Sequence, residues 1–363
     1  MRIICTVTND LNYDQRMIRI CSTLVEAGYE VLLVGRQKAD SKPLRQQNFQ
    51  QHRLTCYFEK GKFFYLEYNI RLMFFLFGQQ VDVINSIDLD SLLSGVIVGR
   101  LRGKKVVYDA HEYYTEVPEL VNRPMTQAIW KFIANACIPR VDMAYTVCES
   151  LSKIFEQKYK KSFSVVRNVP FVRAFAAANA PQEHHILYQG ALNEGRGLEQ
   201  MIESMAYISD ACLWLAGEGD LSKALRHLVQ TKGLNERVKF LGYLSPEALW
   251  EVTQNATIGI NLLENKGLSY YYSLANKAFD YIQAGIPSIN MNFPEYQLIN
   301  EQYATFVLID DLEVETIANA TNQLLKDHHY YQQIKENCSI ARKELNWSKE
   351  KKKLLEVYAR LLG

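Results

Sequence analysis

Residues 185–199 decide the fold, and they read His-Ile-Leu-Tyr-Gln-Gly-Ala-Leu-Asn-Glu-Gly-Arg-Gly-Leu-Glu. A short apolar run passes directly into a loop that carries three glycines and an arginine. Such a run, bounded by glycine, is typical of a buried strand that ends in a tight loop. Similar runs recur on both sides of it, with helical stretches between them. This alternation predicts parallel sheets with helices on both faces.

The apolar runs form two sets of six, separated at residues 170–181 by a segment without a strong period. Strands of the first set are expected at 3–7, 30–35, 81–85, 105–108, 143–147 and 163–167, with helices at 15–27 and 89–101 among others. Strands of the second set are expected at 185–189, 212–216, 238–241, 258–263, 288–291 and 306–309. The prediction is an α/β protein of two Rossmann-like, doubly wound domains, residues 1–172 and 173–345, followed by a helix at about 346–363. Ligands of such domains bind beyond the carboxyl ends of the strands, so we expect a site in a cleft where the domains face each other.

The composition narrows the functional class. A chain of 363 residues is too long for one ordinary core, which also favours two domains. A formal net charge of +1 argues against a nucleic-acid partner. The seven cysteines are scattered and form no CxxC pair, so neither a disulfide framework nor a zinc site is expected. With no signal-peptide pattern and no apolar run of about 20 residues, we expect a cytoplasmic protein that meets a membrane only peripherally, at its inner face.

One segment, residues 62–77, is unusually aromatic. Helical spacing would place much of it in the core, which is the leading interpretation. The alternative is an amphipathic patch that rests on anionic lipid, because Lys60, Lys62 and Arg71 flank it.

A polar stripe is expected on residues 273–285, Ser-Leu-Ala-Asn-Lys-Ala-Phe-Asp-Tyr-Ile-Gln-Ala-Gly, which should form a helix from Ser273 onward. Ser273, Asn276, Lys277 and Asp280 are spaced at i, i+3, i+4 and i+7 and so share one face. A lysine near a helix start opposes the helix dipole unless an anion offsets it. The stripe therefore predicts a binding site for the diphosphate and ribose of a sugar nucleotide.

Glycine-rich loops follow two expected strands of the second domain. Gly190 and Gly195 frame Arg196, which is suited to clamping a diphosphate, although a surface arginine in a flexible loop is the alternative. Gly217 and Gly219 either let the backbone approach a ligand or only make a tight turn. The glycine spacing of a dinucleotide-binding fingerprint is incomplete here and absent from the first strand, so a nicotinamide oxidoreductase ranks last.

In the first domain, polar side chains gather after expected strands. His111 closes one strand, and Asp109 and Glu112 beside it are expected to set its tautomer. Four residues are expected on the acceptor side: Asp14, Arg16, Asp88 and Glu112. Asp14 alternatively caps the helix after the first strand, and capping is the leading role for Asp88 or Asp90. Arg16, in the first turn of a helix, requires an anion nearby.

Taken together, five motifs resemble family 4 glycosyltransferases of the GT-B fold over nearly the whole chain. The motifs are Asn-Asp-Leu-Asn-Tyr-Asp-Gln-Arg-Met (9–17), Tyr-Asp-Ala-His-Glu-Tyr (108–113), Gly-Arg-Gly-Leu-Glu (195–199), Leu-Ala-Gly-Glu-Gly-Asp (215–220) and the helix segment from 273 with Ile-Pro after it (273–287). The resemblance implies retaining transfer of a hexosyl group from a nucleotide-sugar to a glycan or lipid-linked acceptor, as in polysaccharide biosynthesis. It also implies that no cofactor or metal is obligatory and that the C-terminal helix crosses back to the first domain.

Several site residues follow from the resemblance alone. Asp280 matches the second of two glutamates, which holds the ribose. Arg196 stands at the usual phosphate-binding lysine, and His111 matches a histidine near the transferred sugar and the acceptor. The loop expected to frame the base is Gly242, Tyr243 and Leu244.

Three departures from the family pattern remain. Tyr272 replaces the first glutamate, Ala191 replaces a phosphate-binding arginine, and the N-terminal glycine pair is absent. We hypothesise that Lys277 compensates for the arginine and Glu264 for the glutamate. A sugar-nucleotide epimerase of the same fold and a catalytically silent glycosyltransferase-like subunit therefore stay open as alternatives.

Overall fold

The computed structural model describes residues 1–12, 14–173 and 183–362, so the connection expected at 170–181 lies largely outside the described residues. The described chain divides into two compact units. The first comprises Met1–Asn168 and the C-terminal residues from Glu350 onward, and the second is Val169–Lys349. Among the described helices, none combines the length and the apolar character that a bilayer span requires.

The first unit is built on a parallel sheet of seven strands in the order β3-β2-β1-β4-β5-β6-β7. The strands are β1 (Arg2–Thr6), β2 (Glu30–Gln37), β3 (Gln50–Thr55), β4 (Val83–Ile87), β5 (Lys105–Ala110), β6 (Met143–Thr146) and β7 (Ser164–Val165). The prediction of six strands was wrong because it missed β3. This edge strand is mostly polar, and only Leu54 in it is buried, so it has no apolar run.

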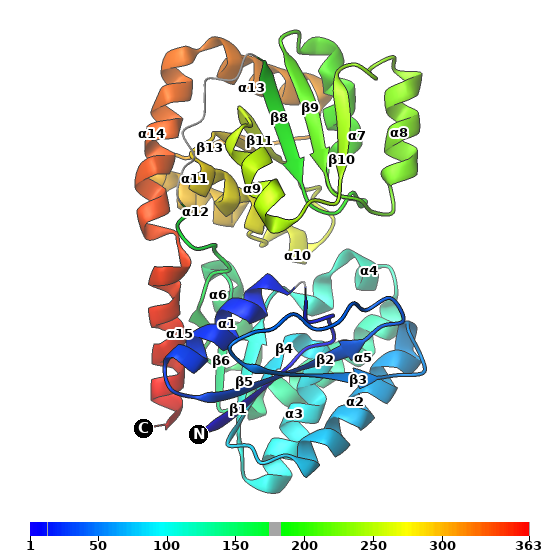
Figure 1. Cartoon of the computed structure of the whole chain (residues 1–363), viewed down its shortest axis with the longest axis vertical. Helices are drawn as coiled ribbons and strands as arrows, with labels where there is room; N and C mark the ends of the chain where they lie inside the picture. The colour runs from blue at the N-terminus through cyan, green and yellow to red at the C-terminus, as the bar shows by residue number, and fades with distance from the viewer. Residues whose placement is uncertain (13, 174–182, 363) are drawn as a thin grey trace. The chain divides into compact units, whose positions relative to one another are not determined.

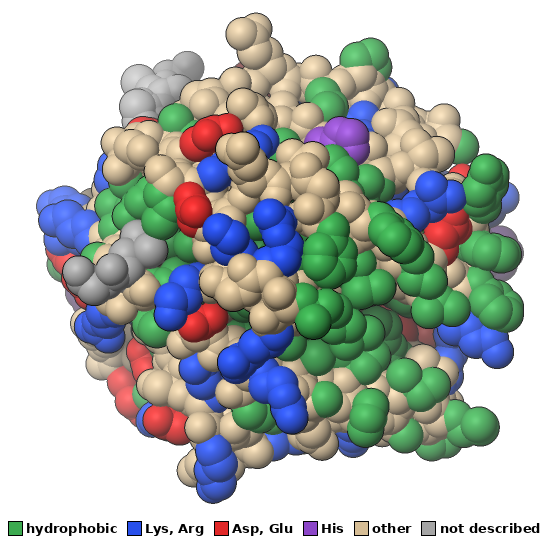
Figure 2. Space-filling view, turned by 90° about the horizontal axis from the view of Figure 1, so that it is seen from below, with side chains coloured by type: hydrophobic (Ala, Val, Ile, Leu, Met, Phe, Trp, Pro, Cys, Tyr) green, Lys and Arg blue, Asp and Glu red, His purple; other side chains and the backbone are tan. Residues whose placement is uncertain are grey.

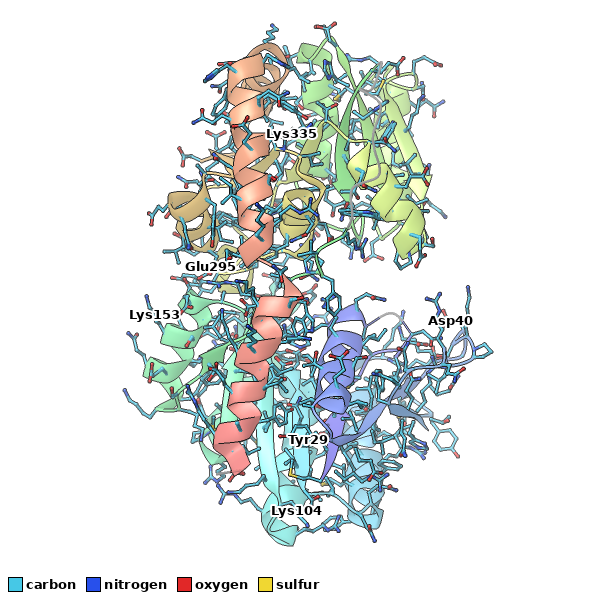
Figure 3. All side chains as sticks on the ribbon, turned by 60° about the vertical axis from the view of Figure 1, so that its left-hand side comes forward. Tyr29, Asp40, Lys104, Lys153, Glu295 and Lys335 are labelled. Atoms are coloured by element: carbon cyan, nitrogen blue, oxygen red, sulfur yellow. The ribbon has the colours of Figure 1, made fainter. Side chains whose placement is uncertain are left out.

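Helices cover both faces of this first sheet. They are α1 (Gln15–Glu26), α2 (Gly61–Gly78), α3 (Asp88–Arg102), α4 (Pro118–Val121), α5 (Pro124–Cys137), α6 (Glu149–Tyr159) and the part of α15 (Trp347–Leu362) from Glu350 onward. α3 packs against both α2 and α5. α1 lies beside α15, with Tyr29 and Tyr358 in ring contact and Lys351 paired with Glu26 (Figures 1 and 3).

The second unit contains a parallel sheet of six strands in the order β10-β9-β8-β11-β12-β13. Its strands are β8 (His184–Gln189), β9 (Ala211–Ala216), β10 (Val238–Gly242), β11 (Ile258–Asn261), β12 (Ser288–Met291) and β13 (Phe306–Ile309). All six agree with the predicted runs to within two residues. The order reverses between β8 and β11, and ligands of doubly wound sheets bind beside such a switch point.

Helices on both faces of the second sheet are α7 (Leu198–Ser204), α8 (Ser222–Thr231), α9 (Pro246–Gln254), α10 (Leu268–Tyr271), α11 (Asn276–Ala284), α12 (Pro294–Tyr303), α13 (Val314–Lys326) and α14 (His328–Glu344) (Figure 1). The expected helix start at Ser273 was wrong by three residues. Ala275 has an extended backbone (φ −69°, ψ 135°), so α11 begins at Asn276. The Ser273 hydroxyl instead donates to the carbonyl of Tyr270 at the end of α10 (2.8 Å).

Candidate functional site

Two loops close over the carboxyl ends of β8 and β9. Gly190 N donates to Ala216 O (2.9 Å), and Leu192 N donates to Glu218 O (3.2 Å). Gly217 has a φ of +141°, and a Cβ atom there would lie 2.0 Å from Gly190 O. Gly217 is therefore needed because one loop backbone passes directly over the other, which is a local structural requirement.

Arg196 is held by a second set of close backbone approaches. Gly195 O accepts a hydrogen bond from Glu264 N (3.0 Å), on the segment that follows β11. At Gly197 a Cβ atom would lie 2.7 Å from Leu262 O, and φ is +61°. The glycines on either side of Arg196 thus attach its loop to the end of β11, at the switch point of the sheet.

Lys277, in the first turn of α11, lies close to the glycine-rich loop that follows β8. Its Nζ is 3.9 Å from the centroid of the Tyr188 ring, and an added Cβ on Gly190 would lie 3.5 Å from it. The Arg196 guanidinium stacks on the Tyr270 ring at 4.9 Å. Burial, and then the charge of Arg196, lower the pKa of Lys277 well below its ordinary value. Among the described residues, no carboxylate oxygen lies within ion-pairing distance of either cation.

The start of α11 is positioned by a buried tyrosine that the sequence did not single out. Tyr296 OH, on α12, accepts a hydrogen bond from Ala275 N (2.9 Å) and another from Asn261 Nδ2 (2.9 Å). Tyr296 is fully buried. It thus links the end of β11 to the residue before the helix. The N–H groups of Asn276 and Lys277, as the first of the helix, have no acceptor within it and are available to an anion.

Asp280, one turn further along α11, is oriented by a hydrogen-bond chain. Gln189 Nε2 donates to Asp280 Oδ2 (2.9 Å), and Thr253 Oγ1 donates to Gln189 Oε1 (2.8 Å). Gln189 is the last residue of β8 and is buried. Sequence reasoning missed Gln189, although its position immediately before the glycine loop was a usable signal.

The remaining donor-side candidates lie around this site with different environments. The Glu264 carboxylate pairs with Lys266 Nζ (2.8 Å), which also pairs with Glu194 (2.7 Å). Asn276 is exposed at the start of α11. β10 ends at Gly242, which has a positive φ, and the loop after it carries an exposed Tyr243 and a Leu244 that packs on the core.

A second polar cluster forms in the first unit, at the carboxyl end of β5. Arg16 Nη2 donates to Asp109 Oδ1 (2.8 Å), and Arg16 Nη1 donates to Val166 O (3.2 Å). Both charged side chains are buried, at 3% and 0% exposure. The anion that the sequence required for Arg16 is therefore Asp109, so the guanidinium is already occupied within the unit.

His111 lies between two carboxylates. Its Nε2 is 3.0 Å from Asp109 Oδ2, its Nδ1 is 3.5 Å from Asp88 Oδ2, and its backbone N donates to Asp88 Oδ1 (2.9 Å). Burial lowers the pKa of His111, but the charges of Asp109 and Asp88 outweigh it and raise that pKa to about 9. The expectation that Glu112 sets the tautomer was wrong, because Glu112 is exposed and Asp88 faces Nδ1 instead.

The capping expectations had mixed outcomes. Asp14 caps α1 as predicted, since its Oδ1 accepts from Met17 N (3.0 Å). Neither Asp88 nor Asp90 caps α3, whose N-cap is Ile87. Asp88 adopts a φ of +55° that turns its carboxylate toward His111, and Asp90 accepts a hydrogen bond from Thr8. Burial, and then the charge of Asp88, raise the pKa of Asp90 to about 7.

Comparison with known proteins identifies the family. The model described as Glycosyltransferase Family 4 matches residues 15–169, and the one described as Glycosyl transferases group 1 matches residues 173–340. The two matches together span nearly the whole chain, one on each unit. The chain therefore belongs to the family 4 glycosyltransferases and has the GT-B fold.

Individual proteins are similar at lower identity. An uncharacterized glycosyltransferase, MJ1607, of Methanocaldococcus jannaschii is 24% identical over 180 residues, a match that spans 48% of this chain and 45% of that protein. Sucrose-phosphate synthase from Thermosynechococcus elongatus has a TM-score of 0.83 at 18% identity, covering 100% of this chain and 99% of its own. Anabaena Alr3699/HepE in complex with UDP-glucose has a TM-score of 0.79 at 14% identity, covering 99% of this chain and 100% of its own.

Proposed function

We propose that this glycosyltransferase transfers a hexosyl group, with retention of anomeric configuration, from a nucleotide-sugar whose diphosphate binds at Arg196, Lys277 and the start of α11. One observation carries the proposal: two cations converge on a helix N-terminus at the switch point of the sheet, and within the described chain neither has a carboxylate partner. A cationic pair of this kind needs an anion. The printed description of HepE, a structure in complex with UDP-glucose, supports a nucleotide-sugar as that anion.

The leaving group explains why these residues suit the reaction. As the bond between sugar and diphosphate breaks, negative charge grows on the phosphate oxygen, and Arg196, Lys277 and the free amides of α11 would neutralise it. Each such contact contributes about 3 kcal/mol in comparable sites. We propose that this replaces an obligatory metal ion. Retention then follows from front-face attack, in which the departing phosphate accepts the acceptor's proton.

Asp280 would bind the ribose. Its second oxygen accepts from Gln189, and the Gln189–Thr253 bond prevents that amide from turning away. Carboxylate oxygens are acceptors that suit ribose hydroxyl groups. Changing Asp280 to Asn should therefore weaken a nucleoside diphosphate and leave inorganic pyrophosphate unaffected. The loop of Gly242, Tyr243 and Leu244 would frame the base, and Glu264 would assist only after leaving Lys266.

The acceptor would bind on the first unit, near His111 and Asp88. Because the His111 pKa is about 9, its ring is an imidazolium at neutral pH, held between the carboxylates of Asp109 and Asp88, and would not act as a base. We propose a glycan or lipid-linked acceptor of polysaccharide biosynthesis, handled in the cytoplasm.

The test begins with thermal-shift measurements of the full chain against nucleoside diphosphates and their sugars, with magnesium or with EDTA. A true donor raises the melting temperature by an amount that grows with the logarithm of its concentration over its dissociation constant, and EDTA should not change the shift. Transfer to candidate acceptors is then followed by NMR of the anomeric proton. Product with the donor's configuration supports the proposal.

Three other outcomes would replace this proposal with an alternative. Inverted product would refute retention. Sugar released or epimerised without any acceptor would indicate an epimerase. Absence of both turnover and nucleotide affinity would indicate a catalytically silent subunit, an outcome for which Tyr272 and Ala191 are the sequence grounds.

A further inference from the structure

Helix α2 is apolar on two opposite sides. Its inner stripe, Phe64, Tyr68, Leu72 and Leu76, is buried in the core of the first unit. Its outer stripe, spaced at helical intervals, is exposed: Phe63, Leu66, Ile70, Phe74 and Phe77. The inner stripe confirms the core interpretation of this segment for half of the helix only. A helix that is apolar all round needs an apolar surrounding on its outer side as well.

Helix α5 continues the same exposed surface. Met125, Ile129 and Phe132 follow one another at helical spacing and are 83%, 59% and 73% exposed. α2 and α5 meet through an edge contact of the Tyr65 and Trp130 rings (5.2 Å), and α3 packs under both. We call the outer stripe of α2 together with these three residues the apolar face. Figure 2 shows hydrophobic side chains gathered on the side where Figure 1 draws α2 and α5.

Exposed cations stand at the start of both helices of the apolar face. Lys60, Lys62 and Arg123 are exposed, and no carboxylate of the described chain pairs with them. Two of the nearby carboxylates are occupied, whereas Glu59 and Glu119 are exposed. Glu67 pairs with Arg71 (2.7 Å) and accepts N–H groups of the loop before α2, and Glu116 pairs with Lys131 (3.0 Å).

We infer that the apolar face binds the surface of an anionic lipid bilayer, with its aromatic side chains in the acyl boundary and the cations on phosphate headgroups. Exposed phenylalanines on a monomer surface mark an interaction site, and a cationic border selects an anionic partner over a neutral one. The aromatic residues are spread along the length of α2 and not gathered in one pocket, which suits a flat, fluid surface. This inference goes beyond the proposed donor chemistry and does not depend on it.

The experiment is vesicle flotation of the full chain, without nucleotide or acceptor, on phosphatidylcholine vesicles with and without phosphatidylglycerol. The wild-type protein should float with the anionic vesicles. Phe74→Gln with Phe132→Gln should lower the partition coefficient at least about tenfold, because both rings lose a buried apolar environment. Lys62→Gln with Arg123→Gln should lower binding to anionic vesicles by about fivefold for each charge.

Matched controls separate this result from a general loss of surface hydrophobicity. Tyr207→Gln with Ile340→Gln, in the second unit, removes side chains that are 62% and 59% exposed and should leave flotation unchanged. Melting temperatures check that each variant folds, and Phe63→Gln with Ile129→Gln repeats the test on other residues of the face. Wild-type protein that does not float, equal loss in the control variant, or a self-association abolished by Phe74→Gln would each overturn the inference.

Discussion

Replacing Lys277 with Met tests the donor site directly, because the change keeps an unbranched side chain only one atom shorter and removes its charge. In the free protein a charge on Lys277 destabilises the fold. The side chain is partly buried, burial and Arg196 lower its pKa, and no described carboxylate pairs with it. A bound diphosphate would supply that compensation. A charge-assisted hydrogen bond contributes about 1.5–3 kcal/mol. We therefore expect Lys277→Met to weaken binding of pyrophosphate and nucleoside diphosphates by about 10- to 100-fold.

The same substitution should not destabilise the fold. Removing an uncompensated charge relieves a desolvation cost, and the methionine still packs on the Tyr188 ring. The free energy of unfolding should therefore fall by no more than about 0.5 kcal/mol. A lysine with a purely structural role would show the reverse pattern, namely lost stability with unchanged affinity.

Isothermal titration calorimetry measures both the affinity and the protons exchanged. A phosphate anion raises the lowered pKa of Lys277, so binding takes up protons and the wild-type affinity falls as pH rises. This pH dependence should be much weaker in Lys277→Met. Lys232→Met is the matched control, since Lys232 is 46% exposed and already paired with Glu203, and it should change the affinity less than about twofold. Unchanged affinity in Lys277→Met would refute the reasoning.

Three further predictions concern stability. Asp109→Asn leaves the buried Arg16 without its anion and should lower the free energy of unfolding by about 3–5 kcal/mol, measured with urea. Because the Asp109 pKa is lowered to about 2, the wild type should lose this stability only as pH falls from about 4 toward 2. Equal stability of variant and wild type at pH 7 would contradict this. Since the carboxylates raise the His111 pKa to about 9, the stability it contributes is fully present below its unfolded pKa of about 6.5 and is lost as pH rises through about 9. His111→Gln should flatten that decline in pH-dependent melting, and a decline of the same size in the variant would assign it to another group. Gly217→Ala should destabilise the protein more than Gly28→Ala in the same urea assay. Both glycines have positive φ, but only at Gly217 does an added Cβ meet backbone, 2.0 Å from Gly190 O. Equal losses of stability would show that the two loops move apart freely.

The sequence was informative wherever the relevant pattern is local. Apolar runs of strand length gave all six strands of the second sheet, and the Asp14 cap lies next to the amide it binds. It failed at β3, since an edge strand with one buried residue has no apolar pattern. It also started α11 three residues early. Asn276, Lys277 and Asp280 lie on the helix as expected, but Ser273 does not, since Ala275, whose N–H bonds to Tyr296, has an extended backbone.

Side-chain partners were harder to predict than elements. The neighbour of His111 in sequence, Glu112, was expected to set the tautomer of the imidazole, but Asp88, the first residue of α3, does so. The hydrogen bond from Gln189 to Asp280 was not predicted either, because the two residues are 91 positions apart in the chain. In a parallel sheet such pairs depend on strand order and register, which no local spacing records.

By itself, then, the amino-acid sequence determined the α/β class, the repeated doubly wound pattern, the glycine loops and the cationic residues that are expected to bind an anion. Only the tertiary structure decided which charges are already satisfied, as for Arg16 with Asp109, and which are left for a ligand, as for Arg196 and Lys277. It also decided that half of α2 faces outward. The physical reason is that periodicity and capping act within a few residues, whereas charge compensation and burial depend on groups that only folding brings together.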